Sequence, residues 1–420
     1  MNVRKIVRVM VAVSLIWGAL TTGALAAEPI KMGAILPLAD STGKDGSRSM
    51  ELAVKQINEK GGLLGRQVKL IMMDDEMKGD KAAAALDKLV TVDNVDIIVG
   101  GVGSGATMGA IPGMKKYGKV VVWIGGASGK IEEAMAGQDW FFHLHAWDYQ
   151  QGALWETGYL EMEQKYGIKR KKTFMAYEEG AFGSGSFKAG KPIYEAAGNE
   201  LQGEAFKSAA LGGGDYRSVL RHAKEFGAES FIWTGYDKDA LPIMEQAKEI
   251  GFAPGLFVGS PPGWPVDFKN TPLNQAVMFY SYWSEAQGVK NKNSKMYSDA
   301  FRKEFKDDPV TYFGPLAYTN IMIVAEAIKR AGTLDNAALI KALEATSYAS
   351  PMGDTFVFKK SKIIDHQAFA SPKIMQWQNG KAQVVWPWEV ATAKLIYPFP
   401  AWDKRDKAAV PAKKAKGEKK

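Results

Sequence analysis

The sequence predicts an α/β protein of two doubly wound lobes, and three observations support this fold class. Short β-branched runs alternate with amphipathic helical segments, a pattern typical of parallel strands buried on both faces. The alternation occurs twice, over residues 30–143 and again over residues 173–259, without a sequence repeat between the two. The chain has 420 residues, too many for one ordinary core and suitable for two domains of ~150–200 residues.

The first lobe is expected to begin with four strands, at residues 30–36, 68–73, 95–100 and 120–124, and to include helices at 47–60 and 81–91. Gly61 and Gly62 follow the first helix, as glycines in the left-handed conformation do, and Asp80 is a candidate N-cap of the second. Ligands on such sheets bind beyond the carboxyl ends of the strands. Three loops rich in small residues occupy that edge, at residues 37–46, 101–107 and 125–130.

The second lobe is expected to repeat the alternation. Its strands are predicted at residues 173–177, 201–206, 230–234 and 256–259, and its helices at 150–165, 186–197, 215–226 (capped by Asp215) and 239–250. After residue 272 the pattern changes to a strand-like run at 276–283, helices at about 293–306, 315–331 and 336–346, and a strand at 355–358. Asn379 and Gly380, a strong two-residue turn signal, predict a hairpin over 373–386.

The first 26 residues are typical of a secretory signal peptide. Arg4, Lys5 and Arg8 precede an apolar run, and Ala24-Leu25-Ala26 fits the small-x-small cleavage pattern, so we expect secretion with cleavage after Ala26. The alternative, a membrane anchor, is disfavoured because the apolar run is short of the ~20 residues that a spanning helix needs.

Charge and cysteine content exclude several classes of function. Of the net charge of +8, residues 1–26 contribute +3 and residues 403–420 contribute +5, so the body of the chain is neutral and gives no indication of nucleic-acid binding. The tail, residues 401–420, is rich in Lys and Ala without periodicity and is predicted to be disordered. The chain has no cysteine, which excludes disulfides and thiol chemistry.

The loop GVGSGAT at residues 101–107 is the first candidate site. Its glycines formally match a dinucleotide fingerprint, but the loop follows the third strand and no acid ends the next one. We interpret it instead as a backbone cradle for a carboxylate, with the Ser104 and Thr107 hydroxyls; a plain helix-capping loop is the alternative.

No catalytic set or resident cofactor is predicted. His143 and His145 share a face of a strand near Asp148, but an isolated pair is a poor basis for a metal site. Asp74, Asp75 and Glu76 lie beside lysines and are interpreted as solvated turn residues.

Several aromatic residues fall near predicted strand ends or crossovers: Trp123, Trp147, Phe182, Trp233, Tyr236, Trp264 and Tyr282. Most such residues belong to a core. Phe182 and Tyr236 are better candidates for a binding site because each follows a strand of the second lobe at its carboxyl end.

The chain resembles periplasmic substrate-binding proteins of the branched-chain amino acid type, which supply ABC-type importers. The resemblance covers nearly all of residues 28–390 and rests on LPLADSTGKDGSRSMELAVKQINEKGGLLGRQVKLIMMDDE, DIIVGGVGSGATMGAIP, VVWIGGASGKIEEA, AFGSG and TGYDKDALPIMEQAKEIGF. It implies a type I periplasmic binding protein fold, whose lobes are joined by a three-stranded hinge and close on a ligand. We expect residues 27–147 and 273–350 to form the N-terminal lobe and residues 148–272 and 351–400 the C-terminal lobe.

The resemblance also implies site residues. Ser104 falls where the family binds a ligand carboxylate. Gly126, Ala127 and Ser128 fall on its second ligand loop. Phe182 and Tyr236 fall on its two second-lobe aromatic positions.

Two positions depart from the family. Its first-lobe aromatic falls at Asp45, and the acid that pairs with an amino acid's ammonium falls at Pro261. Because a buried ammonium without a partner is costly, another acid must replace the lost one, or the ligand is not an α-amino acid. The replacements considered are Asp45, Asp148, Asp237 and Glu178.

The predicted function is therefore a secreted, monomeric, non-enzymatic protein that captures a small carboxylate-bearing ligand and delivers it to the membrane permease of an ABC importer. Trp147, with Phe182, Tyr236 and Trp264, is expected to flank the ligand. Three alternatives stay open: a non-amino-acid ligand such as an aromatic carboxylate, amide or urea; a ligand-sensing partner of a membrane receptor; and an enzyme on the same scaffold.

Overall fold

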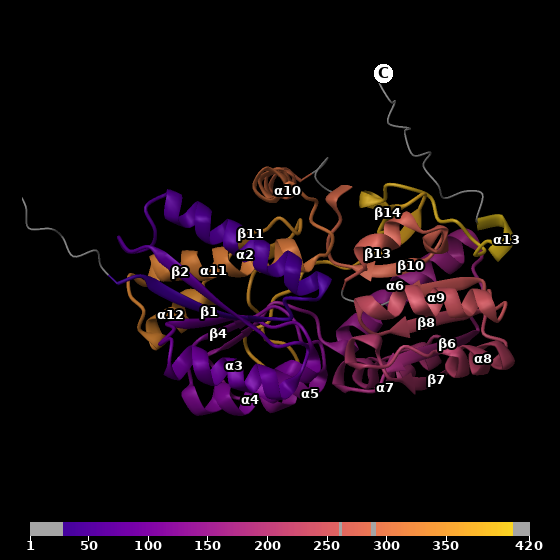
Figure 1. Ribbon diagram of the computed structural model, residues 1–420, viewed down its shortest axis with the longest axis horizontal. Helices are drawn as coiled ribbons and strands as arrows, with labels where there is room; N and C mark the ends of the chain where they lie inside the picture. Colours follow the sequence, from indigo (N-terminus) through magenta and orange to yellow (C-terminus); the bar gives the residue numbers. More distant parts are fainter. Residues whose placement is uncertain (1–27, 260–262, 287–290, 406–420) are drawn as a thin grey trace, which may run out of the picture.

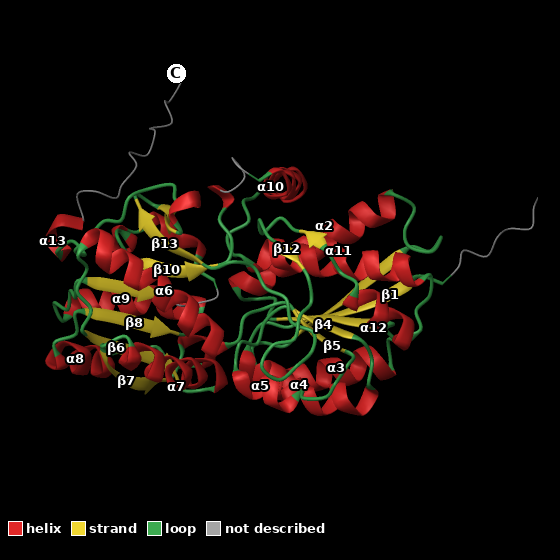
Figure 2. Ribbon diagram, turned by 180° about the vertical axis from the view of Figure 1, so that it is seen from behind, coloured by secondary structure: helices red, strands yellow, loops and turns green. Residues whose placement is uncertain are grey.

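The computed structural model describes residues 28–259, 263–286 and 291–405 and shows two α/β lobes side by side (Figure 1). The predicted signal peptide with its cleavage site, Pro261, and residues 406–420 of the tail lie outside this part of the chain. In each lobe the strands form a layer between helices (Figure 2). This is the fold class that the alternating sequence pattern predicts.

The first sheet is parallel throughout and has the order β2-β1-β3-β4-β5. Its strands are β1 (Ile30–Leu36), β2 (Val68–Asp74), β3 (Ile97–Gly100), β4 (Val121–Trp123) and β5 (Phe141–His143). The lobe's helices are α2 (Ser41–Glu59), α3 (Gly79–Thr91), α4 (Ser104–Tyr117), α5 (Gly129–Ala134), α10 (Lys292–Phe305), α11 (Phe313–Ala331) and α12 (Asn336–Glu344). Helices α3, α4 and α5 cover one face of the sheet, and α2 and α11 cover the other (Figure 1).

The second sheet has the order β14-β13-β10-β9-β8-β6-β7, in which β13 and β14 are antiparallel to their neighbours. Its strands are β6 (Lys172–Glu178), β7 (Glu200–Phe206), β8 (Ser230–Thr234), β9 (Leu256–Gly259), β10 (Met278–Ser281), β13 (Lys373–Gln378) and β14 (Lys381–Trp386). Helices α6 (Asp148–Tyr166), α7 (Ala181–Ala196), α8 (Arg217–Phe226), α9 (Ala240–Glu249) and α13 (Trp402–Arg405) belong to this lobe. The predicted hairpin is confirmed: Asn379 and Gly380 both have positive φ in the turn between β13 and β14.

Two glycine-rich segments that were predicted to be loops are partly helical in the structure. Helix α2 begins at Ser41 rather than at 47, because the Asp40 carboxylate accepts a hydrogen bond from the Thr42 amide as an N-cap. Helix α7 begins at Ala181 rather than at 186, because the Glu178 carboxylate accepts from the amides of Gly180 and Gly183. The loops expected at 37–46 and after residue 178 are therefore much shorter than predicted.

Two predicted caps also differ in detail. Asp80 lies within the first turn of α3, and Lys78 is the N-cap residue. Asp215 accepts from the Arg217 amide, but helix α8 begins only at Arg217. Asp80 still places a negative charge at the positive end of the helix dipole, which stabilises it.

The expected lobe boundaries at 273 and 351 are wrong. Strand pairing assigns the segment after residue 273 to the second lobe and the segment after residue 351 to the first lobe. Strand β10 pairs with β9 and β13 in the second sheet. Gln367 pairs with His143 at the end of β5, and the Ala368 amide donates to the His143 carbonyl, which places this segment in the first lobe. The short strands β11 (Tyr348–Ala349) and β12 (Thr355–Phe356) precede it. The chain thus passes between the lobes three times, after β5, after β10 and before β13.

The beginning of the predicted disordered tail is ordered. Arg405 at the end of α13 is buried and donates to the carbonyls of Pro400, Leu273 and Gln275. Its guanidinium also lies over the Phe399 ring. The prediction of disorder from residue 401 is therefore wrong for residues 402–405, which pack on the second lobe (Figure 1).

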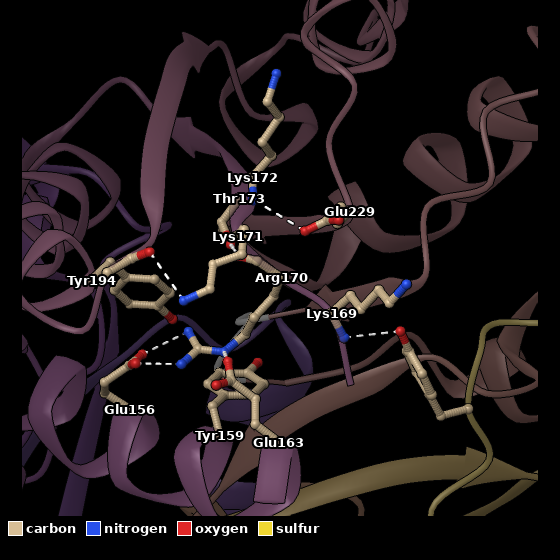
Figure 3. Close-up of polar contacts among 12 residues, drawn as sticks. Glu156, Tyr159, Glu163, Lys169, Arg170, Lys171, Lys172, Thr173, Tyr194 and Glu229 are labelled. Atoms are coloured by element: carbon tan, nitrogen blue, oxygen red, sulfur yellow. Dashed lines mark hydrogen bonds and ion pairs between the residues drawn. The ribbon is translucent and has the colours of Figure 1, made fainter. Parts of the chain in front are cut away.

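A buried ion cluster fixes helix α6 in the second lobe (Figure 3). Arg170 is buried and pairs with both carboxylate oxygens of Glu156, and its Nε lies 2.6 Å from Glu163. The guanidinium also lies over the rings of Tyr159 and Tyr194. Because both glutamates belong to α6, one arginine positions the helix that opens the second lobe.

Candidate functional site

A cavity lies between the lobes at the carboxyl ends of the strands, where the fold predicts a ligand site. It encloses about 500 Å³ of empty space, part of it open to solvent. The first lobe, with the crossings, contributes Val102, Gly103, Ser104, Gly126, Ala127, His145, Tyr282, Tyr312 and Phe313 to its lining; the second contributes Gln151, Trp155, Phe182, Tyr236 and Tyr280. Five of the eight predicted ligand-binding residues, Ser104, Gly126, Ala127, Phe182 and Tyr236, therefore line one cavity.

The start of helix α4 forms the polar end of this lining. Its N-cap is Gly103, which has no side chain to bond the first amides, and Ser104 is buried as the first helical residue. Unsatisfied amides and the helix dipole at such an end favour an anion. The Ser104 Oγ accepts a bond of 3.3 Å from the Ser128 amide, which leaves the hydroxyl proton for another acceptor.

Glycines let the two loops of this wall approach each other. A Cβ at Gly101, where φ is +76°, would collide with the Trp123 indole, and one at Gly126, where φ is +75°, would lie 2.8 Å from the Thr107 Oγ1. The Thr107 hydroxyl is already used: it donates to the Gly103 carbonyl and accepts from the Trp123 indole. Thr107, predicted to bind the carboxylate, thus supports the loop instead.

Aromatic rings form the rest of the wall. The Phe182 and Tyr236 rings lie 5.9 Å apart, and Trp155 stacks on Tyr280 at 4.3 Å. The Tyr280 hydroxyl lies 2.9 Å from that of Tyr159, which adjoins the Arg170 cluster. The cavity wall is thereby connected to the buried ion cluster of α6.

A polar pair lies where the chain crosses between the lobes. The His145 Nε2 lies 2.9 Å from the Tyr312 hydroxyl, and its Nδ1 lies 2.9 Å from the Ala146 carbonyl. Burial lowers the pKa of His145 to about 4, so the imidazole is neutral at pH 7. The neighbouring Tyr282 hydroxyl is buried and has no hydrogen-bond partner.

The three other predicted residues do not line the cavity. Trp147 is fully buried and stacks on His143 at 3.8 Å. Ser128 is also buried, and its Oγ has no hydrogen-bond partner in the structure. Asp45 lies inside the first lobe, where its carboxylate accepts from the amides of Val310 and Thr311, and burial raises its pKa to about 6.

The acids considered as partners of an ammonium are largely engaged elsewhere. Asp148 accepts from the amides of Gly129 and Tyr149, and Glu178 caps helix α7. Asp237 accepts from the Ser41 amide through Oδ2, while its Oδ1 is buried and unpartnered. None of the four is a lining residue of the cavity.

His143 and the acidic turn have structural roles. His143 donates from Nε2 to the Gly125 carbonyl and so holds the ligand-edge loop. Asp74 is exposed and accepts from the Glu76 amide, and the exposed Glu76 pairs with Lys78, as expected for solvated turn residues. The expectation is wrong for Asp75, which is 1% exposed: its carboxylate accepts from the Met77 amide, and burial raises its pKa to about 6. Within the described ranges, no group of three or more His, Cys, Asp or Glu could hold a metal ion.

Sequence reasoning missed Gln151, Trp155, Tyr280, Tyr312 and Phe313 as cavity residues, and it considered His145 only as a metal ligand. Gln151 and Trp155 are four positions apart on α6, so a signal existed: a polar and an aromatic residue on one helix face directly after a crossing. Tyr312 and Phe313 carry no such local signal, because only the return of the chain after β10 brings them to the cavity.

The lobes are in contact around the cavity. The Ser41 amide of the first lobe donates to Asp237 of the second. A Cβ at Gly185 on α7 would lie 2.8 Å from Asp148 and 3.2 Å from Ser128. The structure is therefore a closed arrangement, in which a ligand would be surrounded by both lobes.

This fold and cavity define a two-lobed binding protein. The periplasmic binding protein family model matches residues 29–382, and the chain belongs to that family. The Leu/Ile/Val-binding protein homolog 7 of Brucella abortus is 25% identical over 378 residues, which cover 86% of this chain and 93% of that protein.

Two solved structures show the same fold. The branched-chain amino acid transporter substrate binding protein LivJ from Streptococcus pneumoniae, solved with isoleucine, has a TM-score of 0.70 at 23% identity and covers 88% of this chain and 100% of its own. A solute binding protein of an ABC transporter from R. palustris, solved with benzoate, has a TM-score of 0.72 at 20% identity and covers 92% of this chain and 100% of its own. The predicted type I periplasmic binding protein fold is thus confirmed.

None of the helices in the described part of the chain is both long and apolar enough to span a membrane.

Proposed function

We propose that this protein captures a small carboxylate-bearing ligand between its lobes and delivers it to the permease of an ABC-type importer. The main support is the uncapped start of α4 at Ser104, which opens on an otherwise aromatic cavity. A carboxylate there would accept bonds from backbone amides and from the Ser104 hydroxyl. Ser104, Gly126 and Ala127 would hold the carboxylate, and Phe182 and Tyr236 would pack against the rest of the ligand.

The composition of the wall favours a carboxylate without an ammonium, in particular an aromatic one. The described lining residues include no Asp or Glu, so an α-ammonium would be buried without a counter-charge. Trp155, Phe182 and Tyr236 offer ring faces of the kind that pack against a planar ligand. The likeness to the benzoate-bound R. palustris structure agrees with this choice, whereas the likeness to the isoleucine-bound LivJ structure and to the Leu/Ile/Val-binding protein homolog 7 supports the alternative.

Four of the predicted residues would act on the ligand indirectly or not at all. Ser128 would position Ser104 through its amide, and Trp147 would support the loop through His143. Asp45 would stabilise the first lobe. Trp264 lies in the core of the second lobe and would not contact the ligand.

The remaining parts of the proposal follow from the family and the sequence. The protein would be secreted with cleavage after Ala26, act as a monomer without a cofactor, catalyse no reaction and bind no nucleic acid. Ligand contacts to both lobes would favour the closed state, which the permease would recognise.

A thermal-shift screen tests the binding step. The protein is unfolded and refolded to remove any carried ligand, then heated with branched-chain amino acids, amides, urea and aromatic carboxylates. A ligand at ~100 times its Kd should add about 2.7 kcal/mol to the free energy of unfolding. A shift with a carboxylate supports the proposal; no shift with any carboxylate contradicts it.

Delivery needs a separate experiment. The cognate permease and ATPase are reconstituted in liposomes, and ATP hydrolysis is measured with the loaded protein. Stimulation that depends on the ligand supports delivery to an importer. Transfer of the ligand signal to a receptor without such stimulation would favour the sensory alternative.

A further inference from the structure

The cavity wall at the lobe crossings contains hydroxyl groups that the binding of a carboxylate does not use. Tyr312, Tyr282 and His145 line the cavity together and are each at most 8% exposed. The Tyr282 ring lies 5.1 Å from the His145 ring and 5.2 Å from the Tyr312 ring, both edge-on. The three side chains therefore form one compact cluster, which we term the crossing cluster.

The hydrogen bonds of His145 determine what Tyr312 can offer. The Nδ1 of His145 faces the Ala146 carbonyl, which can only accept, so the proton lies on Nδ1. The neutral imidazole then presents a lone pair on Nε2, and the Tyr312 hydroxyl at 2.9 Å must donate to it. The Tyr312 oxygen is left with lone pairs, and it can only accept a further hydrogen bond.

Gln151 makes this arrangement more rigid. Its side-chain amide donates to the same Ala146 carbonyl over 2.8 Å. The Gln151 nitrogen also lies 3.5 Å from His145 Nδ1, a much longer contact than the 2.9 Å from Nδ1 to the Ala146 carbonyl. The shorter contact decides the tautomer, because a proton on Nε2 would leave Nδ1 and the carbonyl facing each other as two acceptors.

The Tyr282 hydroxyl is different, since it is buried without a partner in the structure. Burial, with the nearby Tyr312 next, raises its pKa well above the usual value, so it remains protonated. A buried hydroxyl without a hydrogen bond costs free energy that a ligand group can recover. Tyr282 can supply the donor that Tyr312 lacks.

We infer that the crossing cluster is a specificity determinant, which selects ligands bearing a hydroxyl group that donates to Tyr312 and accepts from Tyr282. A second carboxylate is excluded there, because it could only accept and would face the Tyr312 lone pairs. A ligand that carries a hydrogen atom in place of this hydroxyl group would leave the Tyr282 hydroxyl without a hydrogen-bond partner. This inference rests on the proposed function and specifies its ligand as a hydroxylated carboxylic acid.

The test is a ratio of dissociation constants measured by calorimetry. Benzoate is compared with 3-hydroxybenzoate and 4-hydroxybenzoate, and phenylalanine with tyrosine, so that the ratio is defined for aromatic acids and for amino acids. We expect a hydroxylated member to bind at least about tenfold more tightly than its parent, the effect of one to two hydrogen bonds. The ratio should fall close to 1 in Tyr282→Phe and in Tyr312→Phe.

Tyr159→Phe is the matched control. It also removes a buried tyrosine hydroxyl, but Tyr159 lies outside the cavity lining, so the ratio should stay as in the unaltered protein. Tyr282→Phe removes an unpartnered group and should not lower the melting temperature of the free protein, which separates loss of selectivity from misfolding.

The outcomes are distinguishable. If parent and hydroxylated acids bind equally well, or if Tyr282→Phe keeps the preference, the inference is overturned while the proposed function stands. If none of the compounds binds, both the proposed function and this inference fail.

Discussion

The backbone amide of Ser41 in the first lobe donates a hydrogen bond of 3.1 Å to Oδ2 of Asp237 in the second. The preceding residue, Asp40, has a buried carboxylate beside Asp237, and burial first and Asp237 second raise its pKa well above the ordinary value. Closure of the lobes therefore brings together two carboxylates that are more stable with a proton on Asp40. Asp40 is therefore both the N-cap of helix α2 and a residue of the lobe interface.

Ligand affinity is expected to depend on pH through Asp40. In an open state, away from Asp237, we expect the Asp40 carboxyl group to be solvated and to have an ordinary pKa, whereas in the closed state its pKa is raised, so closure takes up a proton between these two pKa values. Closure is therefore favoured at low pH and weakens as the pH rises through the raised pKa. Asp40→Asn should bind more tightly than the unaltered protein at pH 8 and show a smaller difference between pH 5 and pH 8 in calorimetry.

Asp45→Asn is the control for this prediction. Asp45 also has a pKa raised by burial, to about 6, but it bonds only within the first lobe. Its substitution should change the pH dependence of stability and leave the pH dependence of affinity in place. An equal effect of both variants on affinity would show that Asp40 acts through general stability.

Ser104→Ala should weaken carboxylate binding by about ten- to a hundredfold, because a hydrogen bond to a charged group contributes about 1.5–3 kcal/mol. The Ser104 hydroxyl accepts only one long bond from Ser128 in the structure, so the melting temperature should change little. Calorimetric titration of the unaltered protein and of Ser104→Ala with the same carboxylate measures the difference in affinity. Unaltered affinity would show that the carboxylate lies elsewhere.

Phe182→Ala and Tyr236→Ala should weaken binding without unfolding the protein. Each removes a ring from the second-lobe wall of the cavity, where a fully covered ring contributes about 1.5–3 kcal/mol. Circular dichroism checks the fold, and fluorescence titration measures affinity. If both variants retained full affinity, the ligand would not occupy this cavity.

Arg170→Met should lower the free energy of unfolding by about 3–5 kcal/mol, since it leaves the buried Glu156 carboxylate without its partner. Lys191→Met, which breaks the exposed pair with Glu195, should cost at most about 1 kcal/mol. Urea denaturation compares the two. Similar losses in both variants would mean that the α6 ion cluster is not a specific support of the second lobe.

The order of strands and helices follows from hydrophobic periodicity, and the approximate position of the site follows from the edge of a parallel sheet. Ser104, Phe182 and Tyr236 were predicted in this way together with the family resemblance, and the structure places all three on the cavity. Their roles in binding stay predictions.

The rest depends on long-range contacts that local sequence does not encode. The helical start of α2 depends on Asp40 accepting from Thr42, in a segment whose glycines resemble a loop. The assignment of β10 to the second lobe depends on pairing with β13, almost a hundred residues away. Tyr312 reaches His145 only through that crossing of the chain.

Direct calorimetry of the refolded protein shows whether the cavity binds a carboxylate without an ammonium. Benzoate, 4-hydroxybenzoate and leucine are titrated under identical conditions. We expect an aromatic acid to bind with a Kd on the order of micromolar, about −8 kcal/mol, and leucine not to bind measurably. Tighter binding of leucine than of either aromatic acid would overturn this proposal, and Asp237→Asn, which changes the carboxylate with the unpartnered Oδ1, would then be the first variant to test for loss of leucine binding.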